Sequence, residues 1–242
     1  MLLTTKGIVF RTVKYGETSV IADIFTEERG LHTFVGGRVR SPRSRMPFNL
    51  FQPMSVVEAV AYYRDDPGAL NRLKEVRAAV VFTQIPFDVR RGAVALFMAE
   101  VCRKCIREAE KNSALFDFLL AYLLRLDDPD MPFAALPVQF LVQLSEHLGF
   151  QPEVPETGGD WFFDLREGLF SPESPRHGAF LTPEATADML LLLHPDPDAP
   201  AIEAMGRDRR KRLLQGLLQF YRWHIPGFEG VHTPEVMEWV WG

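Results

Sequence analysis

Four arginines fall within eight residues of this chain, in the run Gly-Gly-Arg-Val-Arg-Ser-Pro-Arg-Ser-Arg that begins at Gly36. The guanidinium group is planar, stays charged and donates paired hydrogen bonds to phosphate oxygens. Each phosphate that it neutralises releases condensed counterions, which favours binding to a nucleic-acid backbone. We therefore predict that this segment, the basic finger (residues 36–45), contacts nucleic acid. The alternative is a solvated loop whose charges only maintain solubility. The four candidate side chains are Arg38, Arg40, Arg43 and Arg45.

The two parts of the chain differ in the sign of their charge. Residues 1–80 carry 12 Lys and Arg against 8 Asp and Glu, whereas residues 81–242 carry 15 against 24. Opposite signs predict different partners, with nucleic acid assigned to the first part. Further candidates for phosphate contacts there are Arg11, Lys14 and Arg64. Tyr62 and Tyr63 follow the finger and point to opposite faces of a strand, so one of them can be exposed and stack on a base.

Composition and motifs exclude several other classes. No apolar run approaches the roughly 20 residues of a membrane helix, and the first residues lack the apolar stretch of a signal peptide. We expect a cytoplasmic, nucleoid-associated protein with no membrane partner. No glycine-rich phosphate loop or nucleophile elbow is present, and the six histidines are scattered. We therefore expect a protein that is not an enzyme and has no cofactor.

The two cysteines do not suffice for a metal site. Cys102-Arg103-Lys104-Cys105 has the spacing of half a zinc site. A structural zinc ion needs about four ligands, and the chain has no second pair of cysteines. We predict that both cysteines pack as small apolar side chains on a helix and that no metal is bound.

The first 82 residues predict a small barrel. Short segments rich in Val, Ile, Phe, Thr and Tyr alternate with turn residues, and Gly30 is placed to close a hairpin with a positive φ. Five strands in about 80 residues favour an OB-fold, with an SH3-like barrel as the alternative. The expected strands are residues 2–13, 17–27, 31–39, 53–64 and 72–82.

Residues 83–242 predict a mainly α-helical domain, so the whole chain is expected to be an α+β multidomain protein. The apolar period changes to about 3.6 residues after Phe87. A region rich in proline and glycine, residues 151–181, is expected to be an irregular insertion with a small hairpin from Trp161 to Phe170. The run of cations Arg207–Arg212 is expected to form salt bridges within this acidic part, with an extension of the nucleic-acid surface as the alternative. The first expected helix has its apolar positions between Val94 and Ile106 and also carries Arg107. Further helices are expected over residues 115–126, 132–148 with a kink at Pro137, 183–193 and 203–224, with a short one from Thr233.

Individual residues of this chain resemble the RecO family of recombination mediators and DNA repair proteins. The resemblance is strongest over residues 7–53 and extends to His147-Leu148-Gly149-Phe150 and to the last helices. It implies an OB-fold, single- and double-stranded DNA binding, strand annealing, and loading of the RecA recombinase with the partner RecR. The matching residues in the first part are Gly7-Ile8-Val9, Tyr15-Gly16-Glu17, Phe25-Thr26, Glu28-Arg29-Gly30, Gly36-Gly37-Arg38, Ser44, Leu50 and Pro53.

Two departures from that family are visible. Many members carry four cysteines after the glycine-aromatic step, which form a zinc finger, whereas residues 151–178 contain none. The family also binds the acidic tail of the single-strand-binding protein, often with a cation beside the aromatic residue that corresponds to Phe140. Here that neighbour is Gln139. The expected cationic groove for this tail comprises Arg103, Lys104, Arg107 and Arg125 beside Phe140, with Arg103 and Arg107 on one face of a helix.

Two other functions are consistent with parts of the pattern. The barrel of a protein-interaction module would bind an acidic peptide or protein surface and never touch DNA. A metal-assisted nuclease would need a carboxylate cluster, for which Asp65-Asp66 is the paired candidate. A turn before Pro67-Gly68 explains that pair more simply.

Overall fold

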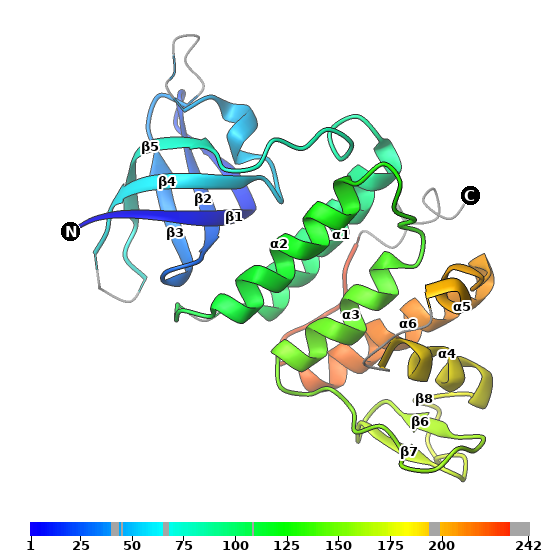
Figure 1. Cartoon of the computed structure of the whole chain (residues 1–242). Coiled ribbons are helices and arrows are strands. Elements are labelled where there is room, and N and C mark those ends of the chain that lie inside the picture. The colour runs from blue at the N-terminus through cyan, green and yellow to red at the C-terminus, as the bar shows by residue number, and fades with distance from the viewer. Residues whose placement is uncertain (40–43, 45, 65–67, 108, 194–198, 233–242) are drawn as a thin grey trace. The chain divides into compact units, whose positions relative to one another are not determined.

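The computed structural model describes residues 1–39, 44, 46–64, 68–107, 109–193 and 199–232. It divides into two compact units, Met1–Pro129 and Asp130–Gly242 (Figure 1). The first unit therefore contains the barrel together with the helical segment that follows it. The predicted carboxylate pair Asp65-Asp66 and the helix predicted from Thr233 lie outside the described residues.

The barrel of the first unit has the connectivity of an OB-fold. Its strands are closed in the order β1-β2-β3-β5-β4, with β3 and β5 parallel and the other neighbours antiparallel. The predicted five-stranded OB-fold is thus confirmed, with strand bounds close to those expected. The strands are β1 (Leu2–Tyr15), β2 (Ser19–Thr26), β3 (Gly30–Gly36), β4 (Val56–Tyr62) and β5 (Asn71–Ala78), and a short 3-10 helix, Phe48–Phe51, precedes β4.

Alternation along the strands fills the barrel. Every second side chain points inward, so Val20, Ala22 and Ile24 of β2 are fully buried and meet Phe34 of β3 in the same core. Gly30 has a φ of +71° and closes the β2–β3 hairpin as predicted, because glycine adopts this conformation without a clash at Cβ.

The helices α1 (Val89–Cys105) and α2 (Ser113–Asp127) belong to the first unit and follow the barrel in the chain. They begin at the side-chain caps of Asp88 and Asn112. Phe25 of β2 stacks on Phe116 of α2 with ring centroids 6.3 Å apart. An apolar side chain on the outside of the barrel is therefore buried because a helix covers it.

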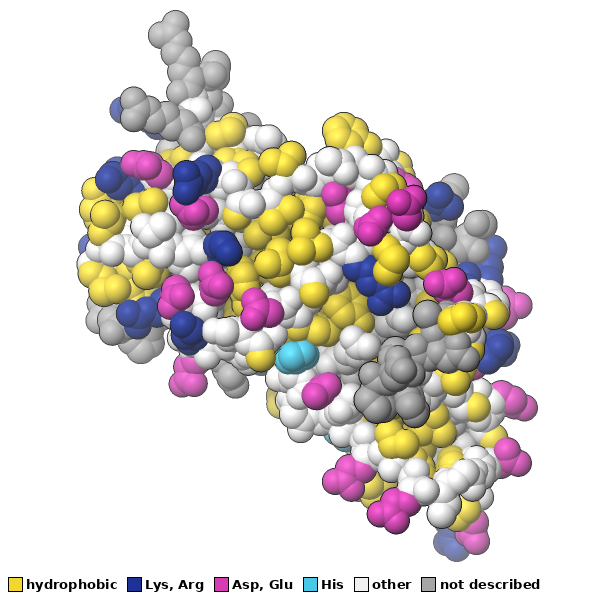
Figure 2. Space-filling view, viewed as in Figure 1, with side chains coloured by type: hydrophobic (Ala, Val, Ile, Leu, Met, Phe, Trp, Pro, Cys, Tyr) yellow, Lys and Arg dark blue, Asp and Glu magenta, His cyan; other side chains and the backbone are white. Residues whose placement is uncertain are grey.

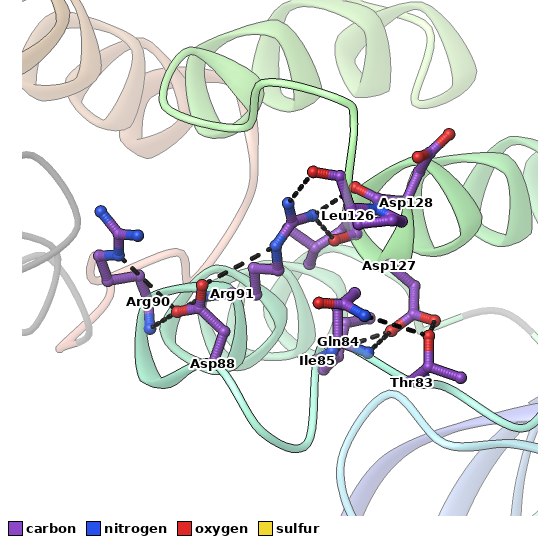
Figure 3. A network of polar contacts seen from close by, with 10 residues as sticks. Thr83, Gln84, Ile85, Asp88, Arg90, Arg91, Leu126, Asp127 and Asp128 are labelled. Atoms are coloured by element: carbon purple, nitrogen blue, oxygen red, sulfur yellow. Dashed lines mark hydrogen bonds and ion pairs between the residues drawn. The ribbon is translucent and has the colours of Figure 1, made fainter.

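The C-terminal end of α2 holds the segment that links the barrel to α1. The carboxylate of Asp127 accepts hydrogen bonds from the backbone N–H groups of Thr83, Gln84 and Ile85 at 2.7–2.8 Å (Figure 3). Partial burial raises the pKa of Asp127, but these hydrogen bonds outweigh it and hold the pKa below its ordinary value. The carboxylate thus fixes the path of the chain as it leaves β5.

Arg91 supports the same joint from α1. Its buried guanidinium donates hydrogen bonds to the carbonyl oxygens of Leu126, of Asp128 at 2.8 Å and of Pro129 at 3.4 Å (Figure 3). The last carbonyls of a helix have no partners inside it, so the arginine satisfies this end of α2. A cation at this end also interacts favourably with the negative end of the helix dipole.

The second unit is helical, with a small three-stranded sheet. Gly216 faces Leu181 so closely that a Cβ there would overlap the leucine side chain. The hydroxyl of Tyr221 donates a buried hydrogen bond of 2.7 Å to the carbonyl oxygen of Leu141, which joins two of the helices. The elements are α3 (Leu136–His147), β6 (Phe162–Asp164), β7 (Leu169–Ser171), β8 (Phe180–Leu181), α4 (Pro183–Leu193), α5 (Ala199–Glu203) and α6 (Arg207–His224).

The structure corrects two expectations in this unit. Pro137 lies in the first turn of α3 and does not kink it, because the first N–H groups of a helix have no intrahelical acceptor to lose. The expected helix over residues 203–224 is divided: Glu203 ends α5, and α6 begins at Arg207.

The predicted hairpin is present and is held by side chains. Asp164 accepts hydrogen bonds from the backbone N–H groups of Arg166 and Glu167 and forms a 3.0 Å contact with Nε2 of His177. Phe163 of β6 is fully buried against Phe170 and Phe220.

Replacing Arg91 by Ala is expected to lower the free energy of unfolding by about 3 kcal/mol, because it removes the charged donor from the buried carbonyl of Leu126 and from the partly buried carbonyls of Asp128 and Pro129. Arg90→Ala is the matched control, since its exposed ion pair with Asp88 is worth at most about 1 kcal/mol. Urea unfolding of both variants measures the difference. Equal losses would show that Arg91 does not cap α2.

Replacing Asp127 by Asn is expected to lower the free energy of unfolding at neutral pH and to lower it less at acidic pH. The folded-state pKa of Asp127 is lowered, so its contribution is complete above the unfolded-state pKa of about 3.9 and is lost as the pH falls through the folded-state pKa. The stability gap between wild type and Asp127→Asn should therefore narrow below pH about 4. Asp117→Asn, at an exposed position of α2, controls for the loss of one charge. A gap independent of pH would contradict the assignment.

Candidate nucleic-acid interface

The residues at the two ends of the basic finger pack into the barrel core. Val39 and Met46 are buried and belong to the same core cluster as Phe34. The hydroxyl of Ser44 donates to the carbonyl oxygen of Met46 at 2.9 Å and accepts from its N–H at 3.0 Å. The two ends of the finger are thus fixed to β3 and to the segment before β4. Arg40, Arg43 and Arg45 lie outside the described residues.

Arg38 lies at the base of the finger in an unusual backbone conformation. Its φ is +58°, in the left-handed region that residues other than glycine, asparagine and aspartate rarely adopt. Such backbone strain is concentrated at functional sites. Arg38 is exposed and lines an open hollow on the barrel surface.

That hollow joins cations to an exposed aromatic ring. It measures about 600 Å³ and is lined by Gly37, Arg38, Met46, Tyr62, Arg72, Leu73 and Lys74. Tyr62 is 53% exposed whereas Tyr63 is 6% exposed, which confirms that the two rings face opposite sides. A cationic groove beside an exposed aromatic ring is the arrangement that binds single strands through phosphate contacts and base stacking.

Sequence reasoning missed Arg72 and Lys74. They follow the alternation of β5, in which Leu73 points inward, so both side chains face out. Arg72 lies opposite Tyr62 of β4 on one side and opposite Val35 of β3 on the other. The alternating pattern Arg-Leu-Lys indicates that both cations face outward, but only strand pairing shows that they lie beside the finger.

The other predicted phosphate contacts are exposed and lie at different places on the barrel. Lys14 is paired with Val20, which is paired with Gly36, so it lies near the finger end of the barrel. Arg11 lies opposite Asp23, and Arg64 lies in the connection from β4 to β5. Figure 2 shows Lys and Arg side chains interspersed with acidic ones over the face of the barrel that it draws.

The face that OB-folds commonly use for oligonucleotides is partly covered here. That face comprises β2 and β3 with the loop between β4 and β5. Phe25 is 1% exposed beneath Phe116 of α2, and Phe10 also stacks on it. The end of α1 leaves a pocket of about 380 Å³ over the remainder. The part of this outer surface around Phe25 therefore serves packing.

The residues predicted to bind an acidic tail have different surroundings. Lys104 pairs with Glu100 at 3.6 Å, and Arg125 is half-buried with its Nε buried. Phe140 is fully buried and belongs to the second compact unit. Arg107 was expected on the same helix as Arg103, but it lies after the end of α1 at Cys105. Arg103 and Arg107 are exposed and line the same pocket, and tail binding by the full set stays a prediction.

Two of the cations at the start of α6 act within their own unit, one of them through an ion pair of the predicted kind. Arg209 forms an ion pair with Asp188, whose side chain is 3% exposed. Arg210 donates to the carbonyl oxygen of Met205. These two side chains are therefore used in packing α6 against α4 and the segment after α5.

Burial keeps both cysteines in the thiol form. Cys102 is fully buried, which raises the pKa of its thiol, and burial raises the pKa of Cys105 to about 12. Metal binding requires thiolates. Within the residues that the structure describes, no three potential His, Cys, Asp or Glu ligands gather around a point.

We predict that the purified protein contains no stoichiometric zinc, because two protonated cysteines on one helix cannot complete a tetrahedral site. Elemental analysis measures the content directly, and a chelator should leave the melting temperature unchanged. About one zinc ion per chain would contradict the prediction and would indicate that Cys102 and Cys105 are zinc ligands.

Among the described helices, none combines the length and the apolar character that a bilayer crossing requires.

Family comparisons agree with the barrel and the helices. Residues 1–82 match the model "Recombination protein O N terminal", and residues 86–230 match "Recombination protein O C terminal". DNA repair protein RecO of Phocaeicola vulgatus is 34% identical over 98% of both chains. The RecO proteins of Bacteroides fragilis and Flavobacterium psychrophilum are 33% and 34% identical over 98% and 99% of both chains. This chain belongs to the RecO family of DNA repair and recombination proteins.

Proposed function

We propose that this protein is a DNA-binding recombination mediator without enzymatic activity. It would bind and anneal DNA strands and help to load the RecA recombinase onto single strands coated by single-strand-binding protein, together with RecR. Family membership supports the role in DNA repair and recombination. The observation that best supports DNA binding is that the basic finger, whose two ends are anchored in the barrel core, lies beside the hollow lined by Tyr62, Arg72 and Lys74.

The geometry favours single strands at the hollow. Arg38, Arg72 and Lys74 offer charge to phosphates, and Tyr62 offers a ring face to a base. Every base has a π-face, so such a site is tolerant of sequence. Phosphate binding by the finger would add affinity and would extend the site to either strand of a duplex.

The proposed protein partners, RecR and the acidic tail of single-strand-binding protein, rest on the family alone. The competing function is a protein-interaction module whose barrel binds an acidic peptide. A peptide site would need apolar anchors and would depend less on salt than a row of phosphate contacts.

Fluorescence anisotropy of labelled single- and double-stranded oligonucleotides across a salt series tests the proposal. We expect binding that weakens steeply with salt and is indifferent to base sequence. Absence of binding at low salt would remove the proposal.

Replacing Arg38, Arg40, Arg43 and Arg45 together by Ala should weaken DNA binding and leave the barrel folded, because the core anchors of the finger are Val39 and Met46. If all four arginines bind phosphate, the slope of log affinity against log salt should shrink by about 3 on single strands. Residual binding is expected at Arg72 and Lys74 of the hollow, or at Arg11, Lys14 or Arg64. An unchanged slope would identify the finger as a solvated loop.

A further inference from the structure

The end of α1 closes a second cationic pocket on the first unit. The pocket of about 380 Å³ lies over the outer faces of β2 and β3 and beside the loop that leads to β5. Arg103 and Arg107 form one wall, and Phe10, Leu31 and Ile106 supply apolar surface. The pocket therefore occupies what remains open of the face that OB-folds commonly use.

Its two arginines are available to a ligand. Both are exposed, and neither makes an ion pair with a residue that the structure describes. Lys104, between them in sequence, is instead engaged by Glu100. Two guanidinium groups above apolar surface match a nucleotide, whose phosphate is charged and whose base is flat and apolar on its faces.

Asp23 is the acid among the described residues that line the pocket. Its Oδ1 accepts a hydrogen bond of 2.8 Å from the hydroxyl of Thr33, which partly satisfies the carboxylate. A phosphate would be repelled from this side and attracted to the opposite wall. The phosphate contacts are accordingly assigned to Arg103 and Arg107.

The pocket and the hollow beside the finger lie along the same strand. Thr33 and Val35 both face outward on β3, and Val35 lies opposite Arg72. Thr33 lines the pocket, and Gly37, which follows β3, lines the hollow. Four residues of strand span about 13 Å, so the two sites are neighbours on the barrel surface.

We infer that Arg103 and Arg107 are DNA contacts, and that a single strand runs from the hollow along the outer face of β3 into the pocket at the end of α1. This inference rests on the proposed DNA binding. It assigns the helical segment after the barrel a direct part in holding the strand. It also takes these two arginines away from the predicted site for an acidic tail.

The double variant Arg103→Gln/Arg107→Gln tests the path. Full-length wild type and variant are titrated against a labelled oligothymidine across a salt series. If both arginines bind phosphate, the variant should reduce the salt slope by about 1.4 on single strands. The control Arg176→Gln/Arg207→Gln removes the same charge from exposed positions of the second unit and should leave the slope unchanged. Thermal melting confirms that the variants are folded.

The outcomes separate the path from the proposed function. A slope that falls only in the Arg103/Arg107 variant supports the path. Intact wild-type binding with an unchanged slope in that variant overturns the path and leaves the proposed function standing, whereas no wild-type binding removes both. A labelled acidic peptide that ends in Phe serves as the competing probe. If the variant loses the peptide and keeps its DNA slope, the pocket is a peptide site and the inference is wrong.

Discussion

The hydrogen bonds of Asp127 to the segment after β5 determine how the rest of the first unit is arranged. Three successive backbone N–H groups turn toward one carboxylate, so the chain leaves the barrel in a single direction. Arg91 then binds the carbonyls that flank Asp127 and ties α1 to the same point. With both helices held, α2 covers Phe25, and the end of α1 stands over β3. The open part of the barrel surface follows from this joint.

A group of cations of the barrel lies around the hollow. The chain as a whole is negative, yet fields fade within about 8 Å at physiological salt, so a phosphate responds to its near neighbours. Around the hollow these neighbours are Arg38, Arg72 and Lys74. One negative charge lies beside them, because a carboxylate oxygen of the exposed Glu75 is 3.7 Å from Nζ of Lys74. Three cations beside one acid give this surface a positive sign. An acidic protein can thus offer a local site for an anion.

Local pattern predicted much of this fold, and tertiary packing decided the remainder. Alternation gave the strands, and Gly30 gave the hairpin, because both depend on residues close in sequence. The four-residue spacing of Arg103 and Arg107 predicted that both lie on one helix face, but α1 ends at Cys105, two residues before Arg107. Arg72 and Lys74 were invisible as a site because strand pairing, which is long-range, sets their neighbours. The sequence indicates that a helix has an apolar face and does not say what covers it.

The hairpin of the second unit is held by hydrogen bonds and buried rings. The carboxylate of Asp164 accepts hydrogen bonds from two backbone N–H groups and contacts the imidazole of His177. Phe163 adds a buried ring against Phe220 of α6. The contact of Phe163 with Phe220 fixes the hairpin to a helix. The hairpin consequently depends on the packing of α6, and its stability is linked to that of the whole second unit.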